Sequence, residues 1–229
     1  MKHQRAFIDS LNITSQNIEG LIIDLQDDYI LEVVKSKSIF NPHRWREAFG
    51  KNAKLTRNIN RACIIHTITG LEIPLKTFSS AKGKDCIEFA GLYSYTERSN
   101  YLMACYDDLK SYLQNGTISR IDIAIDFKDK IPKAIIKKIL VGRYPKQYEN
   151  TTYYKTPKEK KTNQKIDIKT YDKYKAEKIK SDDMLIRLEF CFKGAYLQGY
   201  KLSDLDKLLI KIQKSIKRAA NLTVEIERI

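Results

Sequence analysis

Acidic and aliphatic side chains alternate in the segment Arg120–Asp126, which reads R-I-D-I-A-I-D. Successive side chains of a β-strand point to opposite faces, so the three isoleucines share one face while Arg120, Asp122 and Asp126 share the other. The two carboxylates then lie about 13 Å apart, four residues at ~3.3 Å each. That distance is too long for one ion between them, so neighbouring strands must complete any site.

Two further segments show the same alternation. In 185–192, Arg187 and Glu189 lie opposite an apolar face, and in 165–171, Lys169 and Tyr171 lie opposite Ile166, Ile168 and Thr170. If the three strands share a sheet and an orientation, their polar faces merge. The merged patch is predicted to contain Arg120, Asp122, Asp126, Lys169, Tyr171, Lys173, Arg187 and Glu189.

These side-chain types suit chemistry on a phosphodiester. Carboxylates bind hard divalent cations such as Mg²⁺ or Mn²⁺, and such a cation polarises a phosphate. Lysine and arginine hold the neighbouring phosphates. A tyrosine hydroxyl can attack phosphorus and keep the strand end as a phosphotyrosine ester.

The same residues also have a purely structural interpretation. Arginines beside acids on adjacent strands form ion pairs on a solvated sheet face, and most of the 14 tyrosines must serve packing. The three histidines are isolated, with no H-x-H pair, which excludes a histidine-built metal site.

The composition favours a polyanionic partner. The formal net charge is +14, from 42 Lys plus Arg against 28 Asp plus Glu, and neutralising phosphates releases counterions. Nucleic acid is the first candidate and an anionic membrane surface the second. No segment approaches the ~20 apolar residues of a membrane span, and no signal peptide follows Met1. We therefore expect a cytoplasmic protein that does not enter a membrane, with its four cysteines buried and reduced.

The pattern along the chain predicts one α+β domain over 1–229, a mostly antiparallel sheet with helices packed on one face. The hydrophobic fraction of 42% is sufficient for a sizeable core. Strands are expected at 6–14, 61–67, 71–78, 85–92, 118–127, 151–154, 165–171 and 184–192, and helices at 43–49, 100–113, 132–140 and 201–220.

A lysine-rich stretch precedes the tyrosine segment and is the expected DNA clamp, although a charge run is often only solvated surface. The residues expected to contact DNA are Arg120, Lys155, Lys158, Lys160, Lys161, Lys165 and Lys169. The helix at 43–49, with Arg44 and Arg46, is a second candidate surface.

In the order and spacing of its motifs the chain resembles the replication initiation factor family, which comprises rolling-circle plasmid and phage initiators and related conjugative-element relaxases. The pieces that match are F-I-D-S-L from Phe7, the helix at 100–113, R-I-D-I-A-I-D-F from Arg120, K-T-Y-D-K from Lys169, and L-I-R-L-E-F from Leu185. They span most of the chain; the segment 16–60 matches least.

The resemblance implies a metal-dependent endonuclease and strand transferase that nicks an origin, stays linked through tyrosine and leaves a 3′-hydroxyl. Carried over, Asp122, Asp126 and Glu189 become ligands of Mg²⁺ or Mn²⁺. Tyr171 becomes the nucleophile, assisted by Lys173 and Arg187. Tyr174, Tyr153 and Tyr154 remain alternative nucleophiles. Expected partners are single-stranded or extruded origin DNA, a host helicase and a second copy of the chain.

Two other functions stay open on the sequence. A non-catalytic DNA-binding replication or copy-control protein would show the same charge surplus, with its acids serving structure. A nuclease that uses water would find its D-x-K triplet in Asp126-Phe127-Lys128, provided that the strand ends there.

Overall fold

The structure is a computed structural model that describes residues 4–15, 18–35, 60–77, 85–157 and 164–229. The predicted helix at 43–49 and Lys158, Lys160 and Lys161 lie outside these residues. In chain order, the described elements are β1 (Gln4–Ser15), α1 (Ile18–Asp24), β2 (Tyr29–Lys35), β3 (Asn60–His66), β4 (Glu72–Thr77), β5 (Asp85–Ala90), α3 (Glu97–Lys110), β6 (Thr117–Lys128), α4 (Lys133–Ile139), β7 (Tyr144–Tyr148), β8 (Thr151–Lys155), β9 (Gln164–Asp172), α5 (Lys173–Ala176), β10 (Leu185–Gly194), the 3-10 turn η3 (Leu202–Asp204), α6 (Leu205–Ala220) and β11 (Val224–Ile226).

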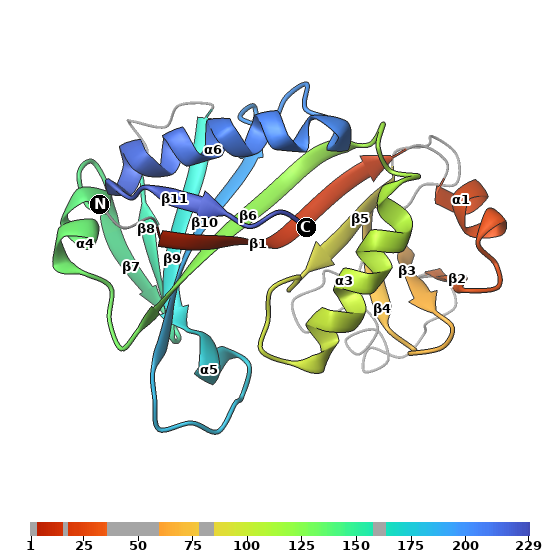
Figure 1. Cartoon of the computed structure of the whole chain (residues 1–229), viewed down its shortest axis with the longest axis horizontal. Coiled ribbons are helices and arrows are strands. Elements are labelled where there is room, and N and C mark those ends of the chain that lie inside the picture. The colour runs from red at the N-terminus through yellow and green to blue at the C-terminus, as the bar shows by residue number, and fades with distance from the viewer. Residues whose placement is uncertain (1–3, 16–17, 36–59, 78–84, 158–163) are drawn as a thin grey trace.

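The strands of the described segments join into one eleven-stranded sheet, in the order β2-β3-β4-β5-β1-β6-β10-β9-β8-β7 (Figure 1). Neighbours along this path pair antiparallel, and β11 adds to β1 in the parallel sense. The predicted mostly antiparallel sheet is confirmed.

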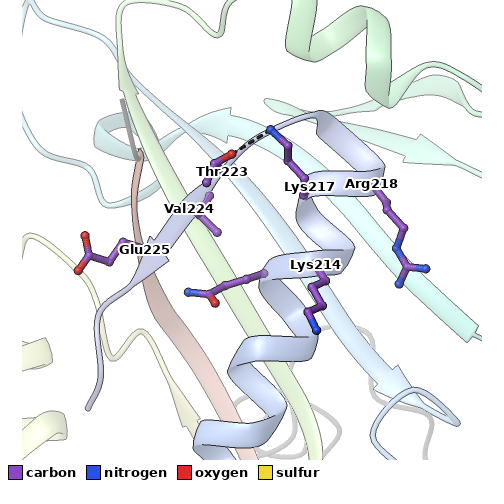
Figure 2. Close-up of a pocket in the computed structure, with 7 residues that line it drawn as sticks. Lys214, Lys217, Arg218, Thr223, Val224 and Glu225 are labelled. Carbon is purple, nitrogen blue, oxygen red and sulfur yellow. Dashed lines mark hydrogen bonds between the residues drawn. The ribbon is translucent and has the colours of Figure 1, made fainter. Parts of the chain in front are cut away.

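One face of the sheet is apolar and carries the helices. The isoleucines of β6 are fully buried on this face, and so are Leu208, Ile212 and Ile216 of α6, which belong to the same core. Apolar residues at helical spacing give α6 one apolar side, and α6 lies over β6 and β10 (Figures 1 and 2). On the same face, Tyr106 of α3 packs edge-to-face on Phe89 of β5, with ring centroids 5.3 Å apart. The α+β class with helices on one face is therefore confirmed.

The opposite face brings the three predicted polar strands together. β10 lies between β6 and β9, so Arg187 is opposite Asp126 on one side and opposite Tyr171 on the other. Two residues further on, Glu189 is opposite Ala124 and Lys169. Because paired residues point to the same face of a sheet, the polar faces of the three strands merge as the alternation predicts.

A β-bulge in β1 adds an acid to this face. Ile8 pairs with Ile123 and Ser10 with Asp122, so Asp9 is an extra residue between two regular pairs. A bulge leaves its extra residue outside the regular pairing and redirects its side chain. Asp9 therefore lies on the polar face beside Arg187 rather than in the apolar core.

The end of β9 differs from the expectation for Lys173. The strand ends at Asp172, whose carboxylate accepts hydrogen bonds from the backbone nitrogens of Tyr174 and Lys175 and so caps α5. Lys173 is the first residue of this short helix rather than part of the strand, and it is buried. Its Nζ still reaches the polar face, where it lies 3.8 Å from Asp9 Oδ1.

Some strands were not expected from the sequence. β7 reads Y-P-K-Q-Y, is exposed throughout and has no apolar alternation, so only its pairing with β8 defines it. β2 and β11 were also missed.

The helices and the cysteines can be compared with the predictions about membrane spans and disulfides. Each helix in the described segments is too short or too polar to cross a bilayer. The four cysteines are buried and none forms a disulfide, as expected.

Candidate functional site

Arg187 is the centre of a closed ion-pair group beneath the polar face. Its side chain is 0% exposed, and its Nε and Nη2 atoms donate to the two carboxylate oxygens of Asp126 at 2.7 and 2.6 Å. Its Nη1 donates to Asp9 Oδ1 at 2.6 Å and to the carbonyl of Tyr93 at 2.9 Å. Burial alone would lower the pKa of Arg187, but the hydrogen bond to Asp126 and the charge of Asp9 raise it, so this group stays cationic.

A tyrosine and a lysine contact the two acids of this group from outside the guanidinium. Tyr95 Oη donates to Asp126 Oδ2 at 2.9 Å. Lys173 Nζ lies 3.8 Å from Asp9 Oδ1 and 2.7 Å from Glu177 Oε1. Both oxygens of Asp126 and Oδ1 of Asp9 therefore already have partners within the protein.

A second group joins Tyr171, Glu189 and Lys169 across β9 and β10. Tyr171 Oη donates to Glu189 Oε2 at 3.0 Å, and Lys169 Nζ lies 2.7 Å from Glu189 Oε1. Burial is the main cause that raises the pKa of the tyrosine hydroxyl, and the charge of Glu189 adds to it. The hydroxyl is thus protonated at neutral pH and already oriented toward a carboxylate.

Burial also raises the pKa of Glu189, to about 6. Lys169 opposes this shift, while the charges of Asp122 and Asp9 increase it. A carboxylate with a raised pKa is a stronger base than an ordinary glutamate. The second group therefore holds a potential nucleophile, the Tyr171 hydroxyl, within hydrogen-bond distance of a potential general base, the Glu189 carboxylate.

Asp122 lies on the other side of Glu189 and is held by Arg120. The guanidinium donates from Nε and Nη2 to both carboxylate oxygens, at 3.0 and 2.5 Å. Arg120 Nη1 also lies 4.0 Å from Glu88. The Asp122 side chain is 1% exposed, whereas that of Arg120 is 31% exposed and reaches toward solvent.

The predicted metal ligands are placed on one face, each with a basic partner. Asp122 is held by Arg120, Asp126 by Arg187 and Glu189 by Lys169. Among the residues that the structure describes, no three His, Cys, Asp or Glu side chains are arranged to hold a metal ion. The side chains in their present positions do not form a ligand set, so a cation at Asp122 and Glu189 would have to displace Arg120 and Lys169.

A pocket of about 500 Å³ opens beside the second group on the polar face. It is lined by Asn12, Ser119, Arg120, Tyr153, Lys155, Asp167, Ile168, Lys169, Cys191 and Lys193. Three of the predicted DNA contacts, Arg120, Lys155 and Lys169, meet here. Of the other predicted contacts, Lys165 belongs to β9 but its side chain is outside the described structure, as are the three lysines of 158–161.

Several residues of the site were missed from the sequence. Asp9 and Asn12 of β1, Tyr95 after β5, and Lys193 at the end of β10 all contact the acid-bearing strands or line the pocket. The signal for Asp9 was present: two adjacent polar residues, Asp9 and Ser10, interrupt an apolar strand and indicate a bulge. Lys193 continues the alternation of Arg187 and Glu189 beyond the predicted end of the strand, so a longer strand would have included it. Tyr95 gave no comparable signal.

A larger pocket, about 970 Å³, lies between α6 and β11 on the helix-covered side of the sheet (Figure 2). Figure 2 shows Lys214, Lys217 and Arg218 along α6, with Lys217 bonded to Thr223 Oγ1 at 2.9 Å. This pocket includes none of the acids or tyrosines of the polar face.

Comparison with solved structures finds chains of similar fold. The rolling circle replication initiator protein from Geobacillus stearothermophilus superposes with a TM-score of 0.48 and 12% sequence identity, over 92% of this chain and 84% of that one. No family model matches the chain, and no curated protein does. The functional interpretation therefore depends on the side chains of the polar face.

Proposed function

We propose that this chain cleaves one strand of DNA and holds the cut end on Tyr171, in the manner of a rolling-circle replication initiator. The observation that supports it most directly is the 3.0 Å hydrogen bond from Tyr171 Oη to Glu189 Oε2. That pair lies on a sheet face rimmed by cations, in a chain of net charge +14.

The proposed reaction transfers a phosphoryl group from a sugar oxygen to the tyrosine. As Tyr171 Oη attacks the scissile phosphorus, its proton passes to Glu189 Oε2, the acceptor within reach. The new P–O bond forms while the P–O3′ bond breaks. The leaving oxygen takes up a proton from solvent to become the 3′-hydroxyl, and Glu189 later releases its own proton to solvent.

Cations of the polar face complete the proposal. Lys169 lies 2.7 Å from Glu189 and, with Arg120, is placed to attract the phosphates that flank the scissile bond. Arg187 was predicted to act in catalysis, but its side chain is 0% exposed and bound to two acids. We therefore assign it, and the buried Lys173, the role of positioning residues that fix Asp126 and Asp9.

Metal dependence is a separate part of the proposal. Carboxylate oxygens are the donors that Mg²⁺ and Mn²⁺ prefer, and Asp122 lies near enough to Glu189 for its charge to raise the pKa of that glutamate. Such a cation would stabilise charge on the phosphate. An arginine holds both oxygens of Asp126 and of Asp122 alike. Asp126 fits this role less well, because Arg187 is 0% exposed and enclosed, whereas Arg120 is 31% exposed and has solvent into which it can move.

One observation favours a second candidate, a DNA-binding protein that does not cut. Each of the three predicted ligand acids has a basic partner at 2.7 Å or less, which is the pattern of a structural ion-pair network. Such a protein would bind origin DNA through its cations and control replication or copy number without chemistry.

Mass spectrometry of a protein–oligonucleotide adduct distinguishes the two. Incubation of the chain with supercoiled plasmid that carries its origin, with Mg²⁺ or Mn²⁺, should yield nicked DNA and a peptide that contains Tyr171 linked to a 5′-phosphate. Tyr171→Phe should lose the adduct and keep DNA binding, because it removes only the attacking oxygen. An adduct on Tyr174, Tyr153 or Tyr154 would overturn the nucleophile, and DNA binding with no nick under either metal would favour the second candidate.

A further inference from the structure

The 500 Å³ pocket on the polar face has the features of a ligand site in its own right. Its volume lies within the range of about 300–1,000 Å³ that is usual for ligand pockets. Four lining residues are cationic, Arg120, Lys155, Lys169 and Lys193. Asp167 is the one acid among the residues that line the pocket, and it pairs with Lys193 Nζ at 2.5 Å. A ligand of this pocket is therefore expected to carry negative charge.

Asn12 gives this pocket a buried acceptor without a donor. The side chain is 1% exposed, and its Nδ2 faces Glu88 Oε1 at 3.4 Å, which leaves the carbonyl oxygen Oδ1 on the other side of the amide. Oδ1 is buried and has no hydrogen-bond partner among the described residues. A buried acceptor without a hydrogen bond destabilises the protein, so a ligand that donates a hydrogen bond to Oδ1 would gain binding free energy.

Tyr153 and Lys155 supply an aromatic ring and a cation to this pocket. Lys155 Nζ lies 4.7 Å from the centre of the Tyr153 ring, a cation–π contact. No carboxylate within the described segments pairs with this ammonium. It is therefore available to a phosphate, and its movement would bare a ring face on which a base can stack.

The pocket is continuous with the Tyr171 group. Lys169 lines the pocket and also lies 2.7 Å from Glu189, which accepts the hydrogen bond of Tyr171. Arg120 likewise lines the pocket while it holds Asp122. A strand whose scissile phosphate is at Tyr171 would thus place an adjoining nucleotide at the mouth of this pocket.

We propose that the pocket receives one unpaired nucleotide of the single strand that is cut, with its base against Tyr153 and a base N–H donated to Asn12 Oδ1. Lys155 holds the phosphate of that nucleotide, because the ammonium of Lys193 already pairs with Asp167. The proposal rests on the proposed DNA-cleaving function and adds the position at which the strand is recognised by its bases. A base in a duplex is stacked and paired, so the pocket requires single-stranded or extruded DNA.

Fluorescence anisotropy with the full chain tests this inference by measuring the affinity for two fluorescein-labelled single strands of twelve nucleotides. One strand carries natural bases, and the other has the same phosphates but abasic sugars. The wild-type chain should bind the base-bearing strand at least fivefold more tightly, the lower end of what one stacked base contributes. Asn12→Leu and Tyr153→Ala should each bring this ratio toward one and leave abasic binding unchanged.

Controls separate base recognition from charge and from folding. Tyr112→Ala, which changes an exposed tyrosine outside the pocket, should keep the ratio of the wild type. Lys155→Gln should weaken binding of both strands and reduce the slope of log affinity against log salt by about 0.7. If Asn12→Leu does not fold by circular dichroism, Tyr153→Ala carries the test by itself.

The inference is overturned if the wild type binds both strands within twofold, or if the ratio survives in both variants. Displacement of either strand by micromolar dAMP, with a ratio of one, would instead assign the pocket to a free nucleotide and also overturn it. A Tyr171 adduct together with a ratio of one would reject the pocket alone. A high ratio without any adduct would reject DNA cleavage and leave the pocket as a single-strand binding site.

Discussion

Two ion-pair groups share the polar face of the sheet and differ in what their contacts leave available. Around Arg187, both oxygens of Asp126 and one of Asp9 accept from a guanidinium that is 0% exposed. Around Tyr171, the hydroxyl donates to Glu189, whose other oxygen faces a lysine that is 28% exposed. The first group is closed by the protein, and the second borders a pocket.

This difference shows which of the alternating acids on the polar face stabilise the fold and which can take part in chemistry. Asp126 and Glu189 each accept a hydrogen bond from a tyrosine hydroxyl, Tyr95 and Tyr171 respectively. They differ in their basic partner, because Asp126 is held at both oxygens by an arginine that is 0% exposed, whereas the lysine beside Glu189 is 28% exposed. The closed group should therefore govern stability, and the open group should govern chemistry.

The largest expected effect is on stability, from Arg187→Met. Removing the guanidinium leaves Asp126 and Asp9 buried without their counter-charge, which should lower the free energy of unfolding by about 3–5 kcal/mol. Urea denaturation measures it. Arg228→Met removes an exposed pair with Asp206 and should cost less than about 1 kcal/mol. Equal losses in the two variants would show that the Arg187 group is not a structural centre.

Glu189→Gln should instead impair chemistry. The amide keeps the shape and burial of the side chain but cannot accept the tyrosine proton, so adduct formation at saturating DNA should slow by about 100-fold or more. The free energy of unfolding should change by no more than about 1 kcal/mol. Glu227→Gln, at an exposed pair with Arg5, is the matched control and should form adduct at the rate of the wild type. An unchanged rate in Glu189→Gln would remove this carboxylate from the mechanism.

The smallest expected effect concerns metal binding at the open group. If Mn²⁺ binds Asp122 and Glu189, Mn²⁺ at ten times its Kd should stabilise the wild type by about 1.4 kcal/mol, measured as a rise in Tm. Asp122→Asn should lose most of this rise. A rise of equal size in Asp122→Asn would place the metal elsewhere, and chelation by EDTA that leaves adduct formation intact would show that no metal is needed.

Much of the polar face could be predicted from the sequence because strand alternation is a local property. The period of two assigned Asp122, Asp126, Arg187, Glu189 and Tyr171 to one face, and all five lie there. The bounds of β6 and β10 came within a few residues of the prediction for the same reason. Lys173 reaches this face from a helix rather than from the strand, because a helix cap at Asp172 decides where β9 ends.

Other parts of the site depend on residues far apart in the chain. Asp9 and Arg187 are 178 positions apart, and only the order β1-β6-β10 brings them together. The Nδ2 atom of Asn12 donates to Glu88 of β5, and its Oδ1 atom is left without a partner among the described residues. No local pattern records either partner.

By itself the sequence determined the charge surplus, the α+β class and the two faces of each acid-bearing strand, because these follow from composition and from the geometry of neighbouring residues. Only the tertiary structure decided which acids are held by arginine and which one accepts from Tyr171 beside a partly exposed lysine. The reason is that burial and partner choice arise from strand order and from one bulge in β1, which are set by the packing of the whole sheet.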